Sequence, residues 1–86
     1  MILEATDIEN ILKASLTVES VQAIDLKGGN HWQVNIVANE FEGLSRVKRE
    51  QLVQRSLKDL LANESIHALI VKAKTKAEAE AAKGGS

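Results

Sequence analysis

The segment HWQVNIVAN, residues 31–39, places the strongest constraint on how this chain can fold. Apolar residues occupy every second position from Trp32 to Ala38, and Gln33 and Asn35 lie between them. This two-residue period is typical of a β-strand that has one buried face and one polar face. The segment therefore predicts a strand that packs one of its faces against a hydrophobic core.

A weaker strand pattern precedes this segment. The stretch VESVQAIDL, residues 18–26, carries apolar and β-branched side chains and ends at the turn-forming residues KGGN. A short glycine-containing loop between two strand patterns favours a hairpin. We therefore predict a hairpin over residues 21–38.

Helical patterns lie on both sides of the hairpin. In TDIENILKASL, Thr6 and Glu9 have the spacing of a capping box, and apolar residues recur three and four positions apart. These features predict a helix from about residue 7 to residue 16. After the hairpin, the segment EFEGLS contains Gly43, which can adopt a positive φ, and Ser45, which is a candidate N-cap.

The helix predicted after Ser45 extends to Asn63 and has an apolar stripe along its second half. Val47 is out of phase with that stripe, so we expect a break or a change of direction near residues 48–50. The following segment IHALIVKA, residues 66–73, is apolar on both faces, as expected for a buried central strand. Its connection to the hairpin through helix predicts a parallel pairing with a right-handed crossover.

The C-terminal segment shows a second capping-box pattern at Thr75 and Glu78. The stretch KAEAEAAK consists of good helix formers but has no large apolar side chain to pack against a core. We expect residues 1–75 to form the domain and residues 76–86 to form a poorly anchored helix with a flexible tail. The predicted order is α-β-β-α-α-β-α, an α+β domain whose three-stranded mixed sheet is covered by helices.

The composition excludes several classes of protein. The 86 residues provide for one domain, and the absence of cysteine excludes disulfides and thiolate ligands. The formal net charge of -1 gives no overall attraction to nucleic acid or to an anionic membrane. The N-terminal segment MILEATDIEN lacks the features of a signal peptide, and no apolar run approaches the roughly 20 residues that span a bilayer. We expect a soluble, cytoplasmic protein with no membrane partner.

Catalytic motifs are also missing from the sequence. The chain has no cysteine nucleophile, no G-x-S-x-G motif and no glycine-rich phosphate loop. The carboxylates of Asp25, Glu40 and Glu42 stand in segments that the patterns place at the surface. We therefore expect that the protein is not an enzyme.

His31 and His67 are the two histidines of the chain, and each stands at the predicted start of a strand. Considered alone, each is more commonly a surface residue than a metal ligand. Both could reach the same edge of the sheet if their strands are neighbours. Two imidazoles cannot complete a zinc site or a [2Fe-2S] cluster, but two histidines can bind one iron of such a cluster while thiolates bind the other. The pair is thus suited to be half of a shared cluster site, with a thiol-bearing partner supplying the other half.

A second candidate site consists of Arg46, Lys48 and Arg49 in the first turn of the second predicted helix. Cations at this end oppose the helix dipole, which suggests a use for them. One interpretation is a site for an anion or a nucleic-acid phosphate, assisted by the free backbone N–H groups. The other is that these are solvated charges paired with the glutamates on either side.

The segments HWQV, FEGLSRVKREQLV and IHALIVKAKT, at this spacing, closely resemble the BolA-like family. The resemblance extends from about residue 8 to Thr75, and F-x-G-x-S-R-x-x-R and I-H-A-L are its most specific parts. It is nearest to the branch that has a histidine directly before the aromatic residue of the second strand. The resemblance implies the class II KH-like fold, which has the element order predicted above.

The resemblance also implies ligands and partners. BolA-like proteins pair with monothiol glutaredoxins and share with them a glutathione-coordinated [2Fe-2S] cluster. On this basis His67 is the general cluster ligand, and His31, in the region of the loop between the first two strands, is the second. The isolated protein is expected to hold no cofactor and to be a monomer or a weak homodimer. Members are also described as DNA-binding transcription regulators in the stress response, which here implicates Arg46, Lys48 and Arg49.

The sequence departs from the family pattern in three respects. Glu50 stands where a histidine usually follows R-x-x-R, which removes a possible positive charge from the nucleic-acid site. The residues from Thr75 to Ala79 replace the usual T-P-x-x-W, so the terminal helix lacks an anchoring tryptophan. The second ligand, His31, is a histidine rather than a cysteine.

The leading hypothesis is an iron-sulfur cluster assembly or trafficking adaptor that holds a [2Fe-2S] cluster only together with a monothiol glutaredoxin. The alternative is a DNA-binding transcriptional regulator with weak affinity for DNA. The two hypotheses place function at different sites, the first at the histidines that begin two strands and the second at the cations that begin a helix.

Overall fold

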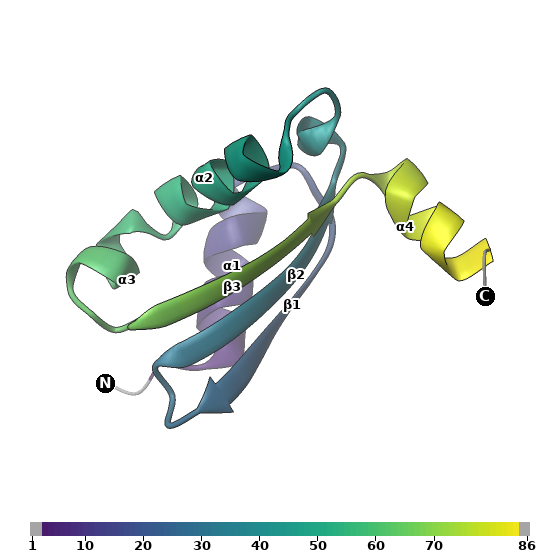
Figure 1. Ribbon diagram of the computed structural model, residues 1–86. Helices are drawn as coiled ribbons and strands as arrows, with labels where there is room; N and C mark the ends of the chain where they lie inside the picture. Colours follow the sequence, from purple (N-terminus) through teal and green to yellow (C-terminus); the bar gives the residue numbers. More distant parts are fainter. Residues whose placement is uncertain (1–2, 85–86) are drawn as a thin grey trace.

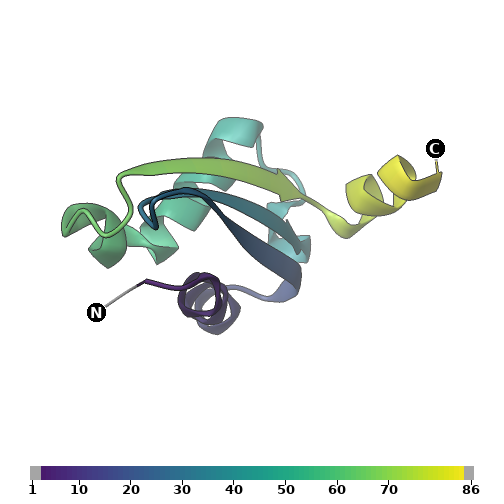
Figure 2. The same cartoon turned by 90° about the horizontal axis from the view of Figure 1, so that it is seen from below.

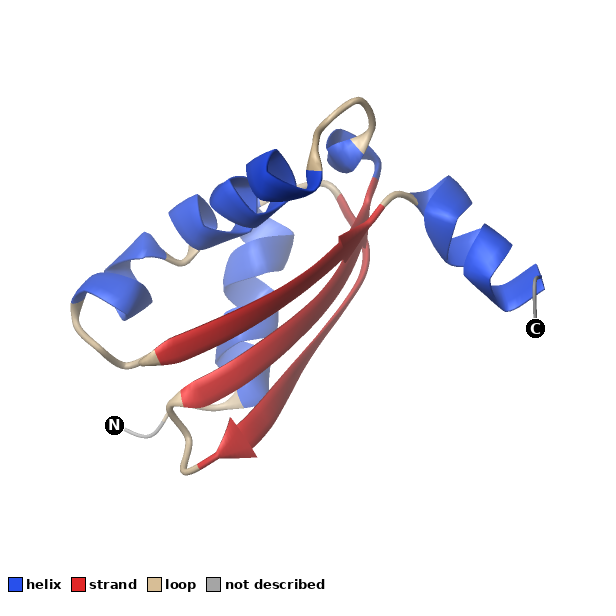
Figure 3. Cartoon of the chain, viewed as in Figure 1, coloured by secondary structure: helices blue, strands red, loops and turns tan. Residues whose placement is uncertain are grey.

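The computed structural model describes residues 3–84 of the chain, and for residues 82–84 it describes the backbone alone. The elements are, in order, α1 (Ala5–Ser15), β1 (Val18–Lys27), β2 (His31–Ala38), a short 3-10 helix η1 (Asn39–Phe41), α2 (Arg46–Ser56), α3 (Lys58–Ala62), β3 (Ala68–Lys74) and α4 (Lys76–Gly84). Figures 1 and 3 show their arrangement. The predicted α+β order α-β-β-α-α-β-α is confirmed. None of the helices within residues 3–84 is long and apolar enough to cross a membrane.

The three strands form one mixed sheet in the order β1-β2-β3. β1 and β2 pair antiparallel as the predicted hairpin, whereas β2 and β3 pair in parallel, with α2 and α3 in the connection between them. The central strand is β2, so the prediction that residues 66–73 form the central strand is wrong. Ile70, which suggested burial on both faces of that strand, is 46% exposed because β3 lies at the edge and only its other face meets the core.

The hydrophobic core lies between the sheet and the helices. Figure 1 shows α1 behind the strands, and Figure 2, turned by 90°, shows it below them. Because the side chains of β2 from Trp32 to Ala38 are buried at every second position, the residues between them lie on the opposite face of the sheet. We call this opposite face the open face. The helices α1 and α2 and the turn after α2 contribute the fully buried side chains Ile8, Leu12, Val53 and Leu57 to the core.

The first helix begins earlier than predicted. Glu4 is its N-cap, and the backbone N–H of Glu4 donates a hydrogen bond of 2.8 Å to Oδ2 of Asp7. The predicted capping box at Thr6 and Glu9 is therefore wrong. Oε2 of Glu9 instead accepts a hydrogen bond of 2.9 Å from the backbone N–H of Ala23. A side chain predicted to cap its own helix thus ties α1 to β1.

The helix α2 runs without interruption through residues 48–50, so the break predicted there is wrong. Val47 is out of phase with the apolar stripe because it points to solvent, with 61% of its surface exposed. The change of direction comes at Leu57, whose N–H donates to the carbonyls of Val53 and Gln54 over 3.2 and 3.1 Å. The Leu57 side chain is buried in the core, which fixes the turn between α2 and α3 against the sheet.

The loop before α2 follows the prediction. Gly43 has a φ of 78°, a region that favours glycine. Ser45 is the N-cap, and its Oγ accepts a hydrogen bond of 3.3 Å from the backbone N–H of Lys48. These two residues set the direction in which α2 leaves the end of β2.

Candidate functional site: a histidine pair at the start of two parallel strands

The structure brings the two histidines together at one end of the sheet. β2 begins at His31, and the parallel register pairs His31 with Ala68, the first residue of β3, so that His67, which precedes Ala68, lies at the same end of the sheet as His31. The centroids of the two imidazole rings are 5.8 Å apart, and the ring planes are inclined by 43°. Two imidazoles whose centroids are this close can each turn one ring nitrogen toward the same metal centre.

The backbone around the pair is fixed by the loop that precedes β2. The carbonyl of Asn30 accepts hydrogen bonds from the N–H of His67 over 2.7 Å and from the N–H of Ala68 over 3.3 Å. These bonds join the entrance of β3 to the hairpin loop. The position of His67 relative to His31 therefore depends on backbone contacts, and the imidazole of His67 needs no part in holding the fold.

The hairpin loop is itself held by side chains. Oδ1 of Asp25 accepts hydrogen bonds from the N–H of Lys27 over 3.1 Å and from the N–H of Gly29 over 3.0 Å. The indole Nε1 of the buried Trp32 donates to the carbonyl of Gly29 over 3.0 Å. Gly28 and Gly29 have φ values of 70° and 78°, which only glycine adopts at low cost. The loop thus links the core residue Trp32 to Asn30, which precedes His31 and whose carbonyl binds the backbone N–H of His67.

The two imidazoles differ in their surroundings. His67 is exposed, whereas His31 is half-buried and, being adjacent in sequence to the core residue Trp32, lies on the open face of the sheet. Within the described part of the chain, no group of three or more His, Cys, Asp or Glu residues is placed to hold a metal ion. The pair is a two-ligand site that leaves the other coordination positions of a metal centre to an outside molecule.

The three cations singled out in the sequence do not form one cluster. Arg46 is 81% exposed and lies 3.7 Å from Oε1 of Glu50 in an i,i+4 ion pair. Lys48 lines a separate hollow with Gln51 and Arg55. Arg49 turns toward β3 and α4, and its side chain is only 14% exposed. The structure thus separates Lys48 from the two arginines, and of these two only Arg46 keeps most of its side chain exposed.

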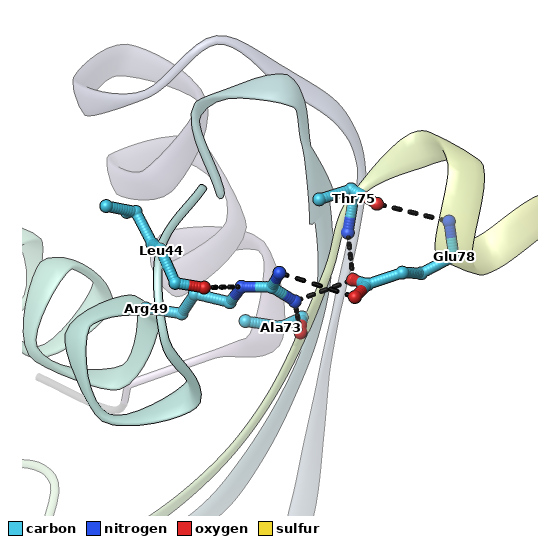
Figure 4. Close-up of polar contacts among 5 residues, drawn as sticks. All are labelled: Leu44, Arg49, Ala73, Thr75 and Glu78. Carbon is cyan, nitrogen blue, oxygen red and sulfur yellow. Dashed lines mark hydrogen bonds and ion pairs between the residues drawn. The ribbon is translucent and has the colours of Figure 1, made fainter. Parts of the chain in front are cut away.

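Figure 4 shows the contacts of Arg49. Its Nε donates to the carbonyl of Leu44 over 3.1 Å, and Nη1 donates to the carbonyl of Ala73 over 3.3 Å. Both terminal nitrogens also contact the carboxylate of Glu78, Nη1 with Oε1 over 2.6 Å and Nη2 with Oε2 over 3.3 Å. Arg49 therefore acts as a link between α2, β3 and α4, and little of its guanidinium is available to an outside anion.

Glu78 also completes the capping box predicted at the start of α4. Its Oε1 accepts a hydrogen bond of 2.8 Å from the N–H of Thr75, and its own N–H donates to Oγ1 of Thr75 over 3.1 Å. The hydrogen bond from Arg49, followed by that from the Thr75 backbone, lowers the pKa of Glu78 from 4.5 to about 2. Sequence reasoning found the capping box but missed the contact with Arg49, because residues so far apart carry no local signal. The flexible tail was predicted for the last three residues, 84–86; Gly84 instead ends α4, and residues 85–86 lie outside the described part of the chain.

A groove of about 390 Å³ runs between the start of α2 and the edge strand β3. Its lining residues are Arg46, Arg49, Glu50, Val71, Lys72, Ala73, Lys74 and Glu78. Lys72 and Lys74 stand two positions apart on β3, and both bring positive charge to this groove, which Arg46 also lines. Sequence reasoning missed both lysines because they stand in a strand remote from the predicted basic turn.

Comparison with known proteins covers nearly the whole chain. The sequence profile of the family described as "BolA-like protein" matches residues 7–78. The acid stress protein IbaG of Escherichia coli strain K12 is 39% identical over 77 residues, which are 88% of this chain and 88% of that protein. BolA-like protein 1 of Mus musculus is 33% identical over 75 residues, which are 78% of this chain and 54% of that protein.

Solved structures share the fold. A Bol-like protein from Babesia bovis superimposes with a TM-score of 0.85 at 26% identity, covering 96% of both chains. BolA1 from Arabidopsis thaliana superimposes with a TM-score of 0.78 at 30% identity, covering 88% of this chain and 98% of that one. The chain therefore belongs to the BolA-like family.

Proposed function

We propose that this protein is an iron-sulfur cluster assembly or trafficking adaptor that shares a [2Fe-2S] cluster with a monothiol glutaredoxin. The observation that carries this proposal is the pair formed by His31 and His67, whose ring centroids are 5.8 Å apart at the accessible end of two parallel strands. Two histidines are a known ligand set for one iron of a [2Fe-2S] cluster, provided that two thiolates hold the other iron. A chain without cysteine must receive those thiolates from a partner.

The chemistry divides between the two proteins. The chain presents two imidazoles from a rigid strand end, and the glutaredoxin, with its glutathione, would supply the thiolates. A ring nitrogen ligates a metal only when it carries no proton, so protons compete with the cluster for this site. The cluster is cargo that the pair of proteins holds jointly, and we expect the isolated chain to hold none.

The two histidines are expected to contribute unequally. His67 is exposed and its backbone is fixed by Asn30, so its imidazole is free to turn toward an iron without disturbing the fold. His31 is half-buried and follows the glycine-containing loop. We propose His67 as the principal ligand and His31 as the second ligand.

The experiment that tests this proposal is a titration under anaerobic conditions. A monothiol glutaredoxin loaded with [2Fe-2S] is mixed with the protein, and visible absorption and circular dichroism are recorded as the ratio rises. Replacement of thiolate by imidazole ligands changes the cluster bands, and we expect the change to saturate at one chain per cluster. Unchanged bands at a large excess of the protein would exclude a shared cluster.

A DNA-binding regulator is the alternative, and one observation favours it. The groove between α2 and β3 gathers Arg46, Lys72 and Lys74 on one side of the molecule. Such a set can neutralise a few phosphates, although Arg46 is paired with Glu50 and Arg49 is engaged by Glu78. We expect any DNA binding to be weak and insensitive to sequence, since no aromatic side chain lines the groove to stack a base.

The setting of the protein follows from the same site. A partner that offers free thiolates is maintained in reducing compartments such as the cytoplasm, and this is where we expect the protein to act. One relative is named an acid stress protein, and we extend a role in the stress response to this chain as part of the proposal. That name denotes a stress role and no reaction, which agrees with an adaptor rather than an enzyme.

A further inference from the structure

The open face of the sheet continues directly from the histidine pair. His31 and Gln33 are two positions apart on β2, so both lie on this face, about 6.6 Å from each other along the strand. The strand register places Ile24 of β1 and Ile70 of β3 on either side of Gln33. A row of three side chains, Ile24, Gln33 and Ile70, thus crosses the sheet immediately beside the row that contains His31.

This row is more apolar than the rest of the open face. Ile70 exposes 46% of its surface, and the nearby Leu26, in the irregular stretch of β1 next to the hairpin loop, exposes 47%. Gln33, in the middle of this row, donates through Nε2 to Asn35 Oδ1 over 2.9 Å, and Asn35, in the next row, donates through Nδ2 to Gln22 Oε1 over 3.4 Å. Large aliphatic side chains are therefore exposed at the histidine end, whereas amides connected by hydrogen bonds occupy the middle of the face.

The far end of the face is occupied by α4. A hollow there is lined by Ser20, Val37 and residues of α4. Nζ of Lys76 lies 3.9 Å from Oε1 of Glu19 in β1. Figure 1 shows α4 at the end of the sheet remote from the hairpin loop. The helix leaves the histidine end of the open face accessible.

The direction from which a partner can reach the histidines is limited. The face that carries Trp32 packs against α1 and α2, which leaves the open face and the adjoining end of the sheet to a protein that ligates a metal centre held by His31. A [2Fe-2S] cluster is only a few ångströms across, which brings the surface of the partner close to the positions next to His31. Gln33 and Ile70 lie at those positions.

We infer that the row Ile24, Gln33 and Ile70 is the docking surface for the thiol-bearing protein that supplies the cluster. The occupant is the glutaredoxin of the proposed function, on which this inference rests, and it is expected to present an apolar patch next to its cluster thiolate. Burial of exposed aliphatic side chains would hold the two proteins together, while the histidines provide the metal bonds. The aliphatic side chains would thus provide the affinity for the glutaredoxin, and the adjacent histidines would ligate the cluster.

The test compares two exposed aliphatic side chains. In Ile70→Glu a charge is placed in the proposed contact, and in Val47→Glu the same charge is placed on α2, at a residue that is 61% exposed. Isothermal titration with cluster-loaded glutaredoxin should show roughly tenfold or greater loss of affinity for Ile70→Glu, as expected for an interface anchor, and less than twofold change for Val47→Glu. Ile70→Lys, which carries the opposite charge, should weaken binding as well, because the loss comes from apolar contact.

The control for folding is the thermal unfolding of each variant, which should match the wild type. Equal affinity of wild type, Ile70→Glu and Ile70→Lys would overturn the docking inference. If His67→Ala still removed the altered cluster bands in that case, the proposed function would stand without it. Absence of altered bands for the wild type would overturn both.

A second copy of this chain is the competing occupant of the open face. Sedimentation of the isolated protein at several concentrations distinguishes it. A dimer that Ile70→Glu dissociates, together with unchanged affinity for glutaredoxin, would assign the surface to self-association and overturn the inference. A wild-type monomer whose glutaredoxin complex is weakened by Ile70→Glu supports it.

Discussion

Arg49 and Glu78, 29 residues apart in sequence, form a charge-assisted hydrogen bond of 2.6 Å that joins α2 to the first turn of α4. The same carboxylate accepts the N–H of Thr75 and so caps the helix in which it stands. One side chain thus serves both the local start of α4 and its attachment to the rest of the molecule. The helix contains no large apolar side chain, so these polar contacts have an unusually large share in holding it.

Replacement of Glu78 by Gln should loosen α4. The change removes the charge that binds Arg49 and weakens the cap at Thr75, so we expect faster hydrogen exchange at the backbone N–H of Ala79, which bonds to the Thr75 carbonyl over 3.0 Å. Glu80→Gln is the matched control, since Glu80 is an exposed carboxylate of the same helix. Unchanged exchange in Glu78→Gln, relative to this control, would show that the contact does not hold the helix.

Acid should weaken the same attachment. The pKa of Glu78 is lowered from 4.5 to about 2 by the hydrogen bond from Arg49, then by that from the Thr75 backbone. A lowered folded-state pKa stabilises above the unfolded value, so the contribution is complete above about pH 4.5 and is lost as pH falls toward about 2. A carboxyl titration by NMR should give a midpoint near 2 for the wild type and a higher one for Arg49→Gln. A wild-type midpoint close to 4.5 would contradict the contact in solution.

The histidines should affect the cluster and not the fold. We expect His67→Ala to abolish the altered bands of the shared cluster and to change the free energy of unfolding by no more than about 0.5 kcal/mol, as is usual for an exposed residue. His31→Ala should weaken the cluster bands less, because water or another group can replace its nitrogen. Val47→Ala, at an exposed residue of α2 that lies outside the proposed docking surface, is the control. Loss of folding in His67→Ala would make its role structural, and equal loss of the bands in both histidine variants would contradict the ranking.

If the protein binds DNA, the phosphates should contact the groove between α2 and β3 rather than the cations of the first turn of α2 as a group. Three exposed cations can neutralise about two or three phosphates, so the logarithm of affinity should fall with the logarithm of salt concentration with a slope of about -2 to -3. Changing Arg46, Lys72 and Lys74 together to Ala should abolish most of this binding, whereas Lys48→Ala should change it little. Fluorescence anisotropy with labelled duplexes at several salt concentrations measures both. Tight, sequence-selective binding at physiological salt would make the regulator the better hypothesis.

Patterns within a few residues determined much of the secondary structure. The hairpin was predictable because alternation over residues 31–39 and a glycine-containing loop are local features. Ser45 and the pair of Thr75 and Glu78 were recognisable because each cap joins groups only three residues apart. Such contacts form in the same way in whatever fold contains them.

Where two local patterns competed, tertiary contacts chose between them. The start of the first helix offered a capping box at Thr6 and Glu9, but Glu9 bonds to β1 and Glu4 caps the helix instead. Similarly, the apolar residues on both faces of β3 did not show that the strand lies at the edge of the sheet. Exposure of Ile70 depends on which element lies over each face, and that is decided by packing.

The sequence by itself determined the element order, the hairpin and the presence of two histidines at strand starts, because period and turn chemistry are encoded in neighbouring residues. Only the tertiary structure decided that His31 and His67 lie 5.8 Å apart and that Arg49 points toward Glu78 instead of standing with Arg46 and Lys48. Both depend on the parallel register of β2 and β3, whose connection contains α2 and α3. That register is set by how the buried side chains of the strands and helices fit together, a long-range condition that no short segment of sequence contains.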